Sequence, residues 1–171
     1  LALLNLVEGQ REVALTLLRN TQPFYQQSGD ALATAVIHLY LAYTLELEGK
    51  RSEAHQHLQS GLDWLAERHI AYFPYWWHPE LVAQICALAL QLGTQVALVE
   101  HMMAYHLRST ARPPLMTLLT DKDPNVTQRV QAVLALLDEN NEDWVAWLAE
   151  LPDEPVRRVM ERLLRENRLC R

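Results

Sequence analysis

The stretch that decides the fold is LAYTLELEGKRSEAHQHL at residues 41–58, because it repeats LALLNLVEGQREVALTLL at residues 1–18 after a shift of 40 residues. The two segments share seven identical positions: Leu1, Ala2, Glu8, Gly9, Arg11, Ala14 and Leu18 match Leu41, Ala42, Glu48, Gly49, Arg51, Ala54 and Leu58. In each segment the glycine permits the positive φ of a tight turn, and the alanine lets the following helix cross closely. The repeat therefore predicts stacked helix hairpins.

Apolar residues recur at helical spacing along nearly the whole chain, and no sustained alternation indicates a strand. We expect a remnant helix that ends at Gly9, followed by helices over about 11–27, 30–48, 52–68, 80–92 and 95–107. Asp30 and Ser52 are suited to cap two of these helices, Pro23 is expected to bend one, and Gly61 is placed where two helices approach closely. The predicted fold class is all-α, a superhelical stack of antiparallel helix hairpins with a short helical segment after it.

The second part of the chain has a different pattern. Residues 108–114 contain paired prolines after small and polar residues, which predicts a connector between a repeat region at 1–107 and a segment at 115–171. Asp123 and Pro124 are expected to open a helix whose apolar stripe is Val126, Val130, Val133, Leu134 and Leu137. Two shorter helices are expected beyond it, lined by Trp144, Trp147, Leu148 and Leu151 and by Val156, Val159, Met160, Leu163 and Leu164. This segment resembles HEAT-type packing.

Composition narrows the classes of function. The net charge is -6 and the isoelectric point is near 5.6, which argues against a nucleic-acid backbone as the main ligand. With two cysteines and neither a signal peptide nor a membrane-length apolar run, the sequence predicts a soluble, cytoplasmic protein without membrane contact. The sequence begins within a repeat, which is typical of a piece of a longer protein, and an uncapped repeat predicts that the isolated fragment can self-associate.

Residues 1–107 resemble a known family. The Gly-to-Ala spacing, the near-40 period and the run from Trp76 to Val82 before an Ala/Leu-rich helix are similar to the tetratricopeptide (TPR)-like superhelix of bacterial MalT-type regulators. These regulators belong to the STAND group of signal-transducing ATPases. The resemblance implies an attached ATPase switch module and an effector module, often a DNA-binding domain. Neither a Walker A loop nor a helix-turn-helix reader is found in this chain, so nucleotide and DNA binding are not assigned to it.

Few side chains have a pattern typical of catalysis. Glu53 with His57, and His101 with Tyr105, share a helix face at a spacing of four residues, but a zinc site needs three or four converging ligands. Cys86 lies in an apolar run, where a thiol usually acts as a small buried hydrophobe. The arginines near the C-terminus follow the helix dipole, a simpler explanation than phosphate binding. We therefore expect no catalytic residue, metal or cofactor.

The aromatic loop, which spans residues 70–79, is the strongest candidate for a binding site. Its large, rigid side chains are of the kind enriched at binding hot spots, and the first-choice contacts are Tyr72, Tyr75, Trp76, Trp77 and His78. His38, Tyr40 and Tyr43 on the preceding hairpin are second-choice contacts. The alternative interpretation is that the adjacent tryptophans plug the gap between hairpins, and the two roles can coexist.

Together these observations predict a non-enzymatic sensor or arm of a signal-responsive regulator, which binds a protein, a peptide or a small effector through the surface of its repeats. Such an effector would bias the attached switch by preferring one arrangement of the helices. The alternative is a constitutive protein–protein interaction scaffold fused to an unrelated effector module.

Overall fold

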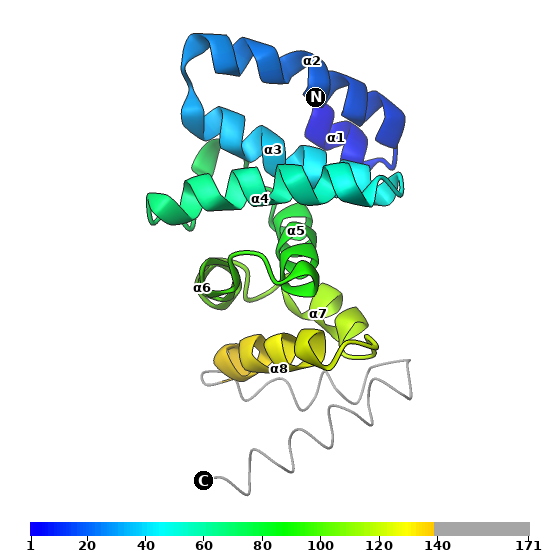
Figure 1. The fold of residues 1–171 in the computed structure, drawn as a ribbon, viewed down its shortest axis with the longest axis vertical. Coiled ribbons are helices and arrows are strands. Elements are labelled where there is room, and N and C mark those ends of the chain that lie inside the picture. Colours follow the sequence, from blue (N-terminus) through cyan, green and yellow to red (C-terminus); the bar gives the residue numbers. More distant parts are fainter. Residues whose placement is uncertain (139–171) are drawn as a thin grey trace, which may run out of the picture.

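The computed structural model describes residues 1–138, apart from the side chain of Tyr75, and this part of the chain is helical without strands (Figure 1). The all-α prediction is therefore confirmed for the described residues. The elements are α1 (Ala2–Val7), α2 (Arg11–Ser28), α3 (Ala31–Leu47), α4 (Arg51–Glu67), the 3-10 turn η1 (Pro74–Trp76), α5 (Pro79–Leu92), α6 (Val96–His106), α7 (Arg112–Leu118) and α8 (Pro124–Asp138).

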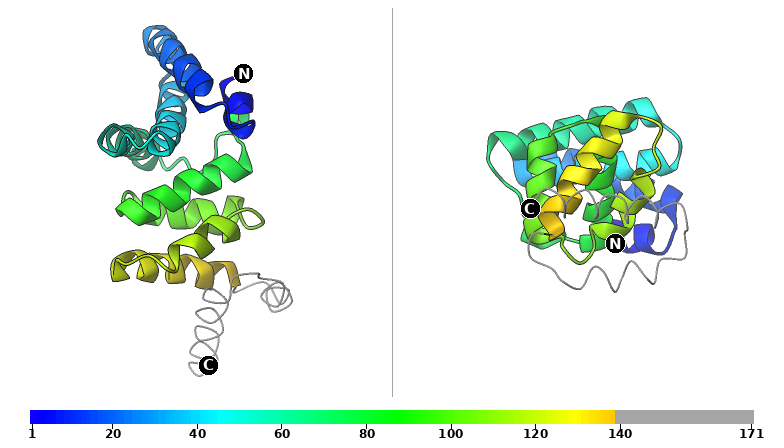
Figure 2. Two further views of the ribbon diagram at one scale, coloured as in Figure 1. Left: turned by 90° about the vertical axis from the view of Figure 1, so that its right-hand side faces the viewer. Right: turned by 90° about the horizontal axis from the view of Figure 1, so that it is seen from below.

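The helices form layers that follow sequence order along the long axis of the molecule (Figure 1). The α1–α2 pair lies at one end, α3 packs between α2 and α4, and α8 lies at the opposite end of the described part. In Figure 1 α3 and α4 run across the view while α5 and α6 are seen nearly end-on, and the left view of Figure 2 reverses this. The helix direction therefore changes between α4 and α5, where residues 68–78 lie.

Most predicted helix ends agree with the structure. Gly9, Gly49 and Gly93 have φ values of 76°, 74° and 72°, as the turns between helices require. Asp30 caps α3, since its Oδ1 accepts from the backbone N–H of Ala33 at 2.9 Å. The prediction for Ser52 was wrong: α4 begins one residue earlier, after Lys50, without a side-chain cap, because the turn closes directly at Gly49. Helix α2 continues through Pro23.

The predicted close approach at Gly61 is confirmed. A Cβ atom at this position of α4 would lie 2.7 Å from Leu39 Cδ2 and 2.8 Å from the backbone oxygen of Ala35, both on α3. Real Cβ contacts are longer than this, and the Ala35 carbonyl belongs to a rigid helix backbone. Only glycine lets α3 and α4 pack at this distance.

The expected connector at residues 108–114 is only partly correct, because its paired prolines lie inside a helix. Arg112, Pro113 and Pro114 form the first turn of α7, because a proline there removes only N–H groups that have no partner within the helix. Arg112 and Asp138 form an ion pair of 2.6 Å between α7 and α8, and both side chains are largely buried. The buried apolar cluster includes residues of α1 through α8.

The prediction for α8 is confirmed. Asp123 Oδ1 accepts from the backbone N–H of Asn125 at 2.9 Å, and the buried residues are those expected: Val126, Val130, Val133, Leu134 and Leu137. The two helices predicted around Trp144 and Val156, like the C-terminal arginines, lie outside the described residues. Within residues 1–138, no helix has the length and apolarity needed to cross a membrane.

Candidate functional site

The inner side of the aromatic loop is tied to the helices beneath it. Phe73 is only 1% exposed and belongs to the buried cluster. The hydroxyl of Tyr40, on α3, donates a hydrogen bond to the backbone oxygen of Trp76. The Trp76 ring packs edge-on against Tyr25 of α2, with 5.9 Å between ring centroids. The inner side, defined as Phe73 and Trp76, therefore fixes the loop to α2 and α3.

Tyr40 is part of this anchor. It is 2% exposed, and burial raises the pKa of its phenol, an effect that the nearby backbone of His78 opposes. The phenol therefore remains a neutral hydrogen-bond donor at physiological pH. Sequence reasoning proposed Tyr40 as a partner contact, but the structure buries its ring and bonds its hydroxyl to the loop backbone, so its side chain is not accessible from the surface.

The outer side of the loop lies against α6. Tyr72 is 47% exposed, and its ring lies 4.8 Å from that of Trp77 and 5.5 Å from that of His106, against which it stacks. His101 continues this line along α6, 6.0 Å from His106 and 4.6 Å from Tyr105, measured between ring centroids. We call these five side chains the ring surface: Tyr72, Trp77, His101, Tyr105 and His106.

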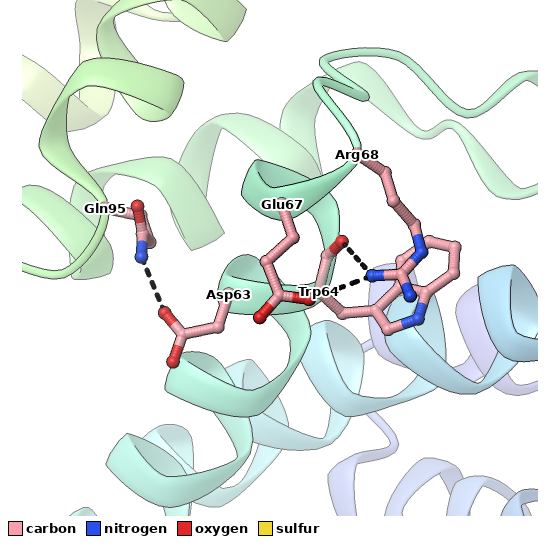
Figure 3. A network of polar contacts seen from close by, with 5 residues as sticks. All are labelled: Asp63, Trp64, Glu67, Arg68 and Gln95. Carbon is pink, nitrogen blue, oxygen red and sulfur yellow. Dashed lines mark hydrogen bonds and ion pairs between the residues drawn. The ribbon is translucent and has the colours of Figure 1, made fainter.

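A hollow of about 390 Å³ adjoins the ring surface at His101. It lies between the end of α4 and α6, and we call it the α4–α6 hollow; its lining residues are Ala66, His69, Ala71, Gln95, Ala97, Leu98 and His101. Gln95 donates from Nε2 to Asp63 Oδ1 at 2.7 Å, so a carboxylate of α4 stands beside the hollow (Figure 3). The lining itself combines small apolar residues with two histidines and Gln95, and Asp63 is linked to it through Gln95.

The end of α4 also holds a guanidinium. Arg68 Cζ lies 4.3 Å from the centroid of the Trp64 ring, and Arg68 Nη1 pairs with Glu67 Oε2 at 3.1 Å (Figure 3). The same nitrogen donates to the backbone oxygen of Trp64 at 3.3 Å. An aromatic face, a carboxylate and a carbonyl thus surround this cation, which is a favourable setting for arginine.

A second concave feature lies on the opposite side of α4. This α2–α4 groove has a volume of about 340 Å³ and is mainly apolar, with the lining residues Tyr25, Gln26, Gly29, Ala31, Thr34, Ala35, His38, Ser60 and Trp64. Its size is at the lower end of the range for small-ligand sites. Tyr25 joins the groove to the loop through its contact with Trp76.

His38 is held inside a polar chain beside this groove. Its Nε2 is 3.0 Å from Gln22 Nε2, and its Nδ1 is 3.0 Å from Nδ1 of His57 on α4. Two imidazole nitrogens at hydrogen-bond distance share one proton, so the pair is incompatible with protonation of both rings. Burial lowers the pKa of His38, and the charge of His57 lowers it further.

His57 and its neighbours complete the chain. Burial lowers the pKa of His57; the charge of Glu53 opposes this, while Arg19 adds to it. Glu53 Oε1 is itself 2.6 Å from Arg19 Nη2. The predicted Glu53–His57 helix face therefore exists, but it serves contacts between α2, α3 and α4.

The remaining candidates are more dispersed. Tyr43 is half-buried near Arg11, and burial raises the pKa of its phenol against the effect of that charge. His78 precedes α5, with Nδ1 3.1 Å from Glu80 Oε2, an ion pair only when the imidazole is protonated. Tyr75 belongs to η1, and its side chain lies outside the described part. Of the loop candidates, Tyr72 and Trp77 therefore meet on the outer side, and Trp76 lies on the inner side. Within the described residues, neither His78 nor Tyr43 joins either group through a ring contact.

The structure also bears on two kinds of chemistry that the sequence raised: a reactive thiol at Cys86 and a metal site. Cys86 is fully buried in α5, which raises the pKa of its thiol to about 12, so it remains a neutral thiol at physiological pH. In the part that the structure describes, no group of three or more His, Cys, Asp or Glu side chains is placed to hold a metal ion.

The chain matches no protein-family model, no curated protein and no solved structure. The resemblance to MalT-type regulators therefore rests on the sequence features quoted above. Within the site, the spacing of His101 and Tyr105 signalled their contact, while Tyr25 and His106 had no local signal and were missed. These two residues are brought to the site by contacts between separate elements. Trp64 was also missed, although its contact with Arg68 has a local spacing of four residues.

Proposed function

We propose that this chain is a non-catalytic binding segment, the sensor or arm of a signal-responsive regulator. One observation carries the proposal: an aromatic loop anchored from below presents the ring surface outward, beside a hollow of about 390 Å³. Aromatic side chains held rigid before binding lose little entropy when a partner covers them. Such a surface fits a protein, a peptide or a small effector.

The wider context of the proposal comes from the sequence resemblance. We infer that the helix pairs belong to a TPR-like superhelix, that an ATPase switch module of the STAND type is attached to it, and that the protein works in the cytoplasm. The layered order of the helix pairs supports the first inference. The helix direction changes at residues 68–78, between α4 and α5. A ligand bound at the loop would contact helices on both sides of this change and could therefore alter the angle between them.

The test measures the melting temperature of the 171-residue chain in the presence of cytosolic extract separated into small-molecule and protein fractions. A ligand at a hundred times its Kd stabilises the folded state by about 2.7 kcal/mol, or several degrees for a chain of this size. We expect one fraction to raise the melting temperature of the wild type, and Tyr72→Ala to abolish the rise. Phe24→Ala, which removes an exposed ring of α2 outside the ring surface, is the matched control and should retain it.

The outcome also separates the sensor from the scaffold. A stabilising small-molecule fraction, or a protein fraction that changes the shape of the chain in small-angle scattering, supports a sensor. Stabilisation by protein without any change of shape supports a constitutive scaffold fused to an unrelated module. A rise that persists in Tyr72→Ala contradicts the ring surface as the site.

Self-association needs a control in these experiments. Leu1, Leu4 and Val7 of α1 are exposed apolar residues, and we expect them to favour contacts between copies of the fragment. Gel filtration at the concentration of the assay shows whether copies associate. A ligand effect that follows the oligomeric state of the protein is then distinguished from binding at the loop.

A further inference from the structure

The aromatic rings of the ring surface and the nearby carboxylate of Asp63 indicate the charge of a partner that would bind there. The surface exposes mainly Tyr105, at 64%, and Tyr72, at 47%, whereas Trp77 is partly buried and packs against Phe73 at 4.9 Å between ring centroids. These rings have negative faces, which attract cations rather than anions. The adjoining α4–α6 hollow has Asp63 beside it, with one carboxylate oxygen held by Gln95 (Figure 3).

The structure contains an internal example of the expected contact. Arg68 lies over the Trp64 ring and pairs with Glu67, so a guanidinium already occupies an aromatic face beside a carboxylate at this end of α4 (Figure 3). The ring surface and the partly exposed Asp63 supply the same two kinds of group next to the α4–α6 hollow, which His101 and Gln95 both line. The net charge of -6 adds a general attraction for cations.

The α4–α6 hollow is suited to the methylene stem of an arginine side chain. Ala66, Ala71, Ala97 and Leu98 provide an apolar lining for a methylene stem, while the charged end remains near the carboxylate. Arginine fits better than lysine because its planar group stacks on rings and meets a carboxylate with two donors. The rings and the hollow are spread over the loop, α4 and α6, which favours a segment with more than one arginine.

We propose that the ring surface and the α4–α6 hollow together bind an arginine-containing, extended segment of a partner protein. This inference rests on the proposed binding function and names its partner class. One arginine stacks on the ring surface, and another places its stem in the hollow with its guanidinium at Asp63. The arrangement predicts that binding depends on both the aromatic side chains and the carboxylate.

The experiment uses the 171-residue chain and three fluorescein-labelled peptides, in which glycine alternates with arginine, lysine or glutamate. Fluorescence anisotropy measures their affinities at low salt and at about 0.5 M salt. The arginine peptide should bind most tightly, the lysine peptide about three- to tenfold more weakly, and the glutamate peptide not at all. Added salt should weaken the binding of both basic peptides.

Variants assign the binding to these side chains. Tyr72→Ala and Tyr105→Ala should each weaken the arginine peptide about three- to fivefold. Asp63→Asn, which keeps an acceptor for Gln95, should weaken it about three- to tenfold at low salt and less at high salt. The matched controls should retain affinity: Phe24→Ala removes an exposed ring, and Asp121→Asn replaces a carboxylate that accepts from Gln91 Nε2 at 3.1 Å.

Three results overturn the proposal: equal binding of the three peptides, no binding at all, and an equal loss of affinity in the control variants. The proposed binding function survives any of them if extract fractions still give a rise in melting temperature that Tyr72→Ala abolishes. It fails separately if that rise is also missing.

Discussion

The two sides of the aromatic loop differ although their residues are neighbours along a short stretch of sequence. Phe73 is 1% exposed and Tyr72 is 47% exposed, yet they are neighbours in sequence. Trp76 packs against Tyr25 while its own neighbour Trp77 turns toward Tyr72 and His106. The comparison shows that the two interpretations of this loop apply to different side chains. Phe73 and Trp76 fill the gap between helices, whereas Tyr72 remains available as a binding surface.

The largest difference between the two sides is expected in stability. Phe73→Ala removes a fully buried ring and should lower the free energy of unfolding by about 3–5 kcal/mol. Tyr72→Ala removes a half-exposed ring and should cost about 1 kcal/mol or less. Urea unfolding of the two variants measures both values. Equal costs would mean that the loop has no inner and outer side.

The anchoring hydrogen bond should give the next largest effect. Tyr40→Phe leaves the Trp76 carbonyl without the hydroxyl donor below it and should cost about 1–2 kcal/mol of stability. Tyr43→Phe is the matched control on the same helix, because its hydroxyl makes no hydrogen bond within the described residues. Urea unfolding compares the two. A cost in Tyr43→Phe as large as in Tyr40→Phe would contradict the anchor.

A smaller effect is expected from the histidine pair beside the α2–α4 groove. The pKa values of His38 and His57 are lowered from their ordinary value of 6.5, so near and below that pH the unfolded chain binds more protons than the folded one. Stability should therefore be complete above pH 6.5 and decrease as the pH falls through the lowered pKa values. Melting curves between about pH 8 and pH 5 measure this slope.

Substitution assigns that slope to the pair. His38→Gln should flatten the dependence of the melting temperature on pH, since one of the two half-buried imidazoles is gone. His101→Gln removes an exposed imidazole of α6 and serves as the control. If His38→Gln melts with the slope of the wild type, the histidine pair is not the source of the acid sensitivity.

The smallest effect on stability is expected at the far end of the ring surface. Tyr105 is 64% exposed, so Tyr105→Ala should change the free energy of unfolding by no more than about 0.5 kcal/mol. The same variant should weaken the arginine peptide severalfold. Urea unfolding and peptide anisotropy measured on one preparation separate these effects. A large loss of stability would make Tyr105 a packing residue and remove it from the ring surface.

Much of the fold follows from local sequence signals. The glycine turns, the Asp30 cap and the apolar stripe of α8 each depend on residues close in sequence, and they were predicted within a residue or so. The start of α7 was missed because Pro113 and Pro114 were interpreted as helix breakers. Proline is tolerated in a first turn, so the sequence alone was ambiguous there.

The site was less predictable, for a physical reason. Helix α3 packs against α2, α4 and α5 and is apolar on most sides, so its pattern does not distinguish the buried Tyr40 from the half-buried His38 and Tyr43. The contacts of Tyr72 with His106, and of Tyr25 with Trp76, join residues that are far apart in sequence. No local spacing encodes such pairs, whereas the spacing of His101 and Tyr105 does.

Hydroxyl-radical footprinting of the native chain, resolved by residue with mass spectrometry and repeated with the arginine peptide, tests the central claim most directly. The two-sided loop predicts rapid oxidation of Tyr72 and Tyr105 and slow oxidation of Phe73 and Tyr40 in the free protein. The peptide should protect Tyr72 and Tyr105 and leave Phe24 unchanged. Oxidation of Phe73 as fast as that of Tyr72, or equal protection of Phe24, would contradict the account.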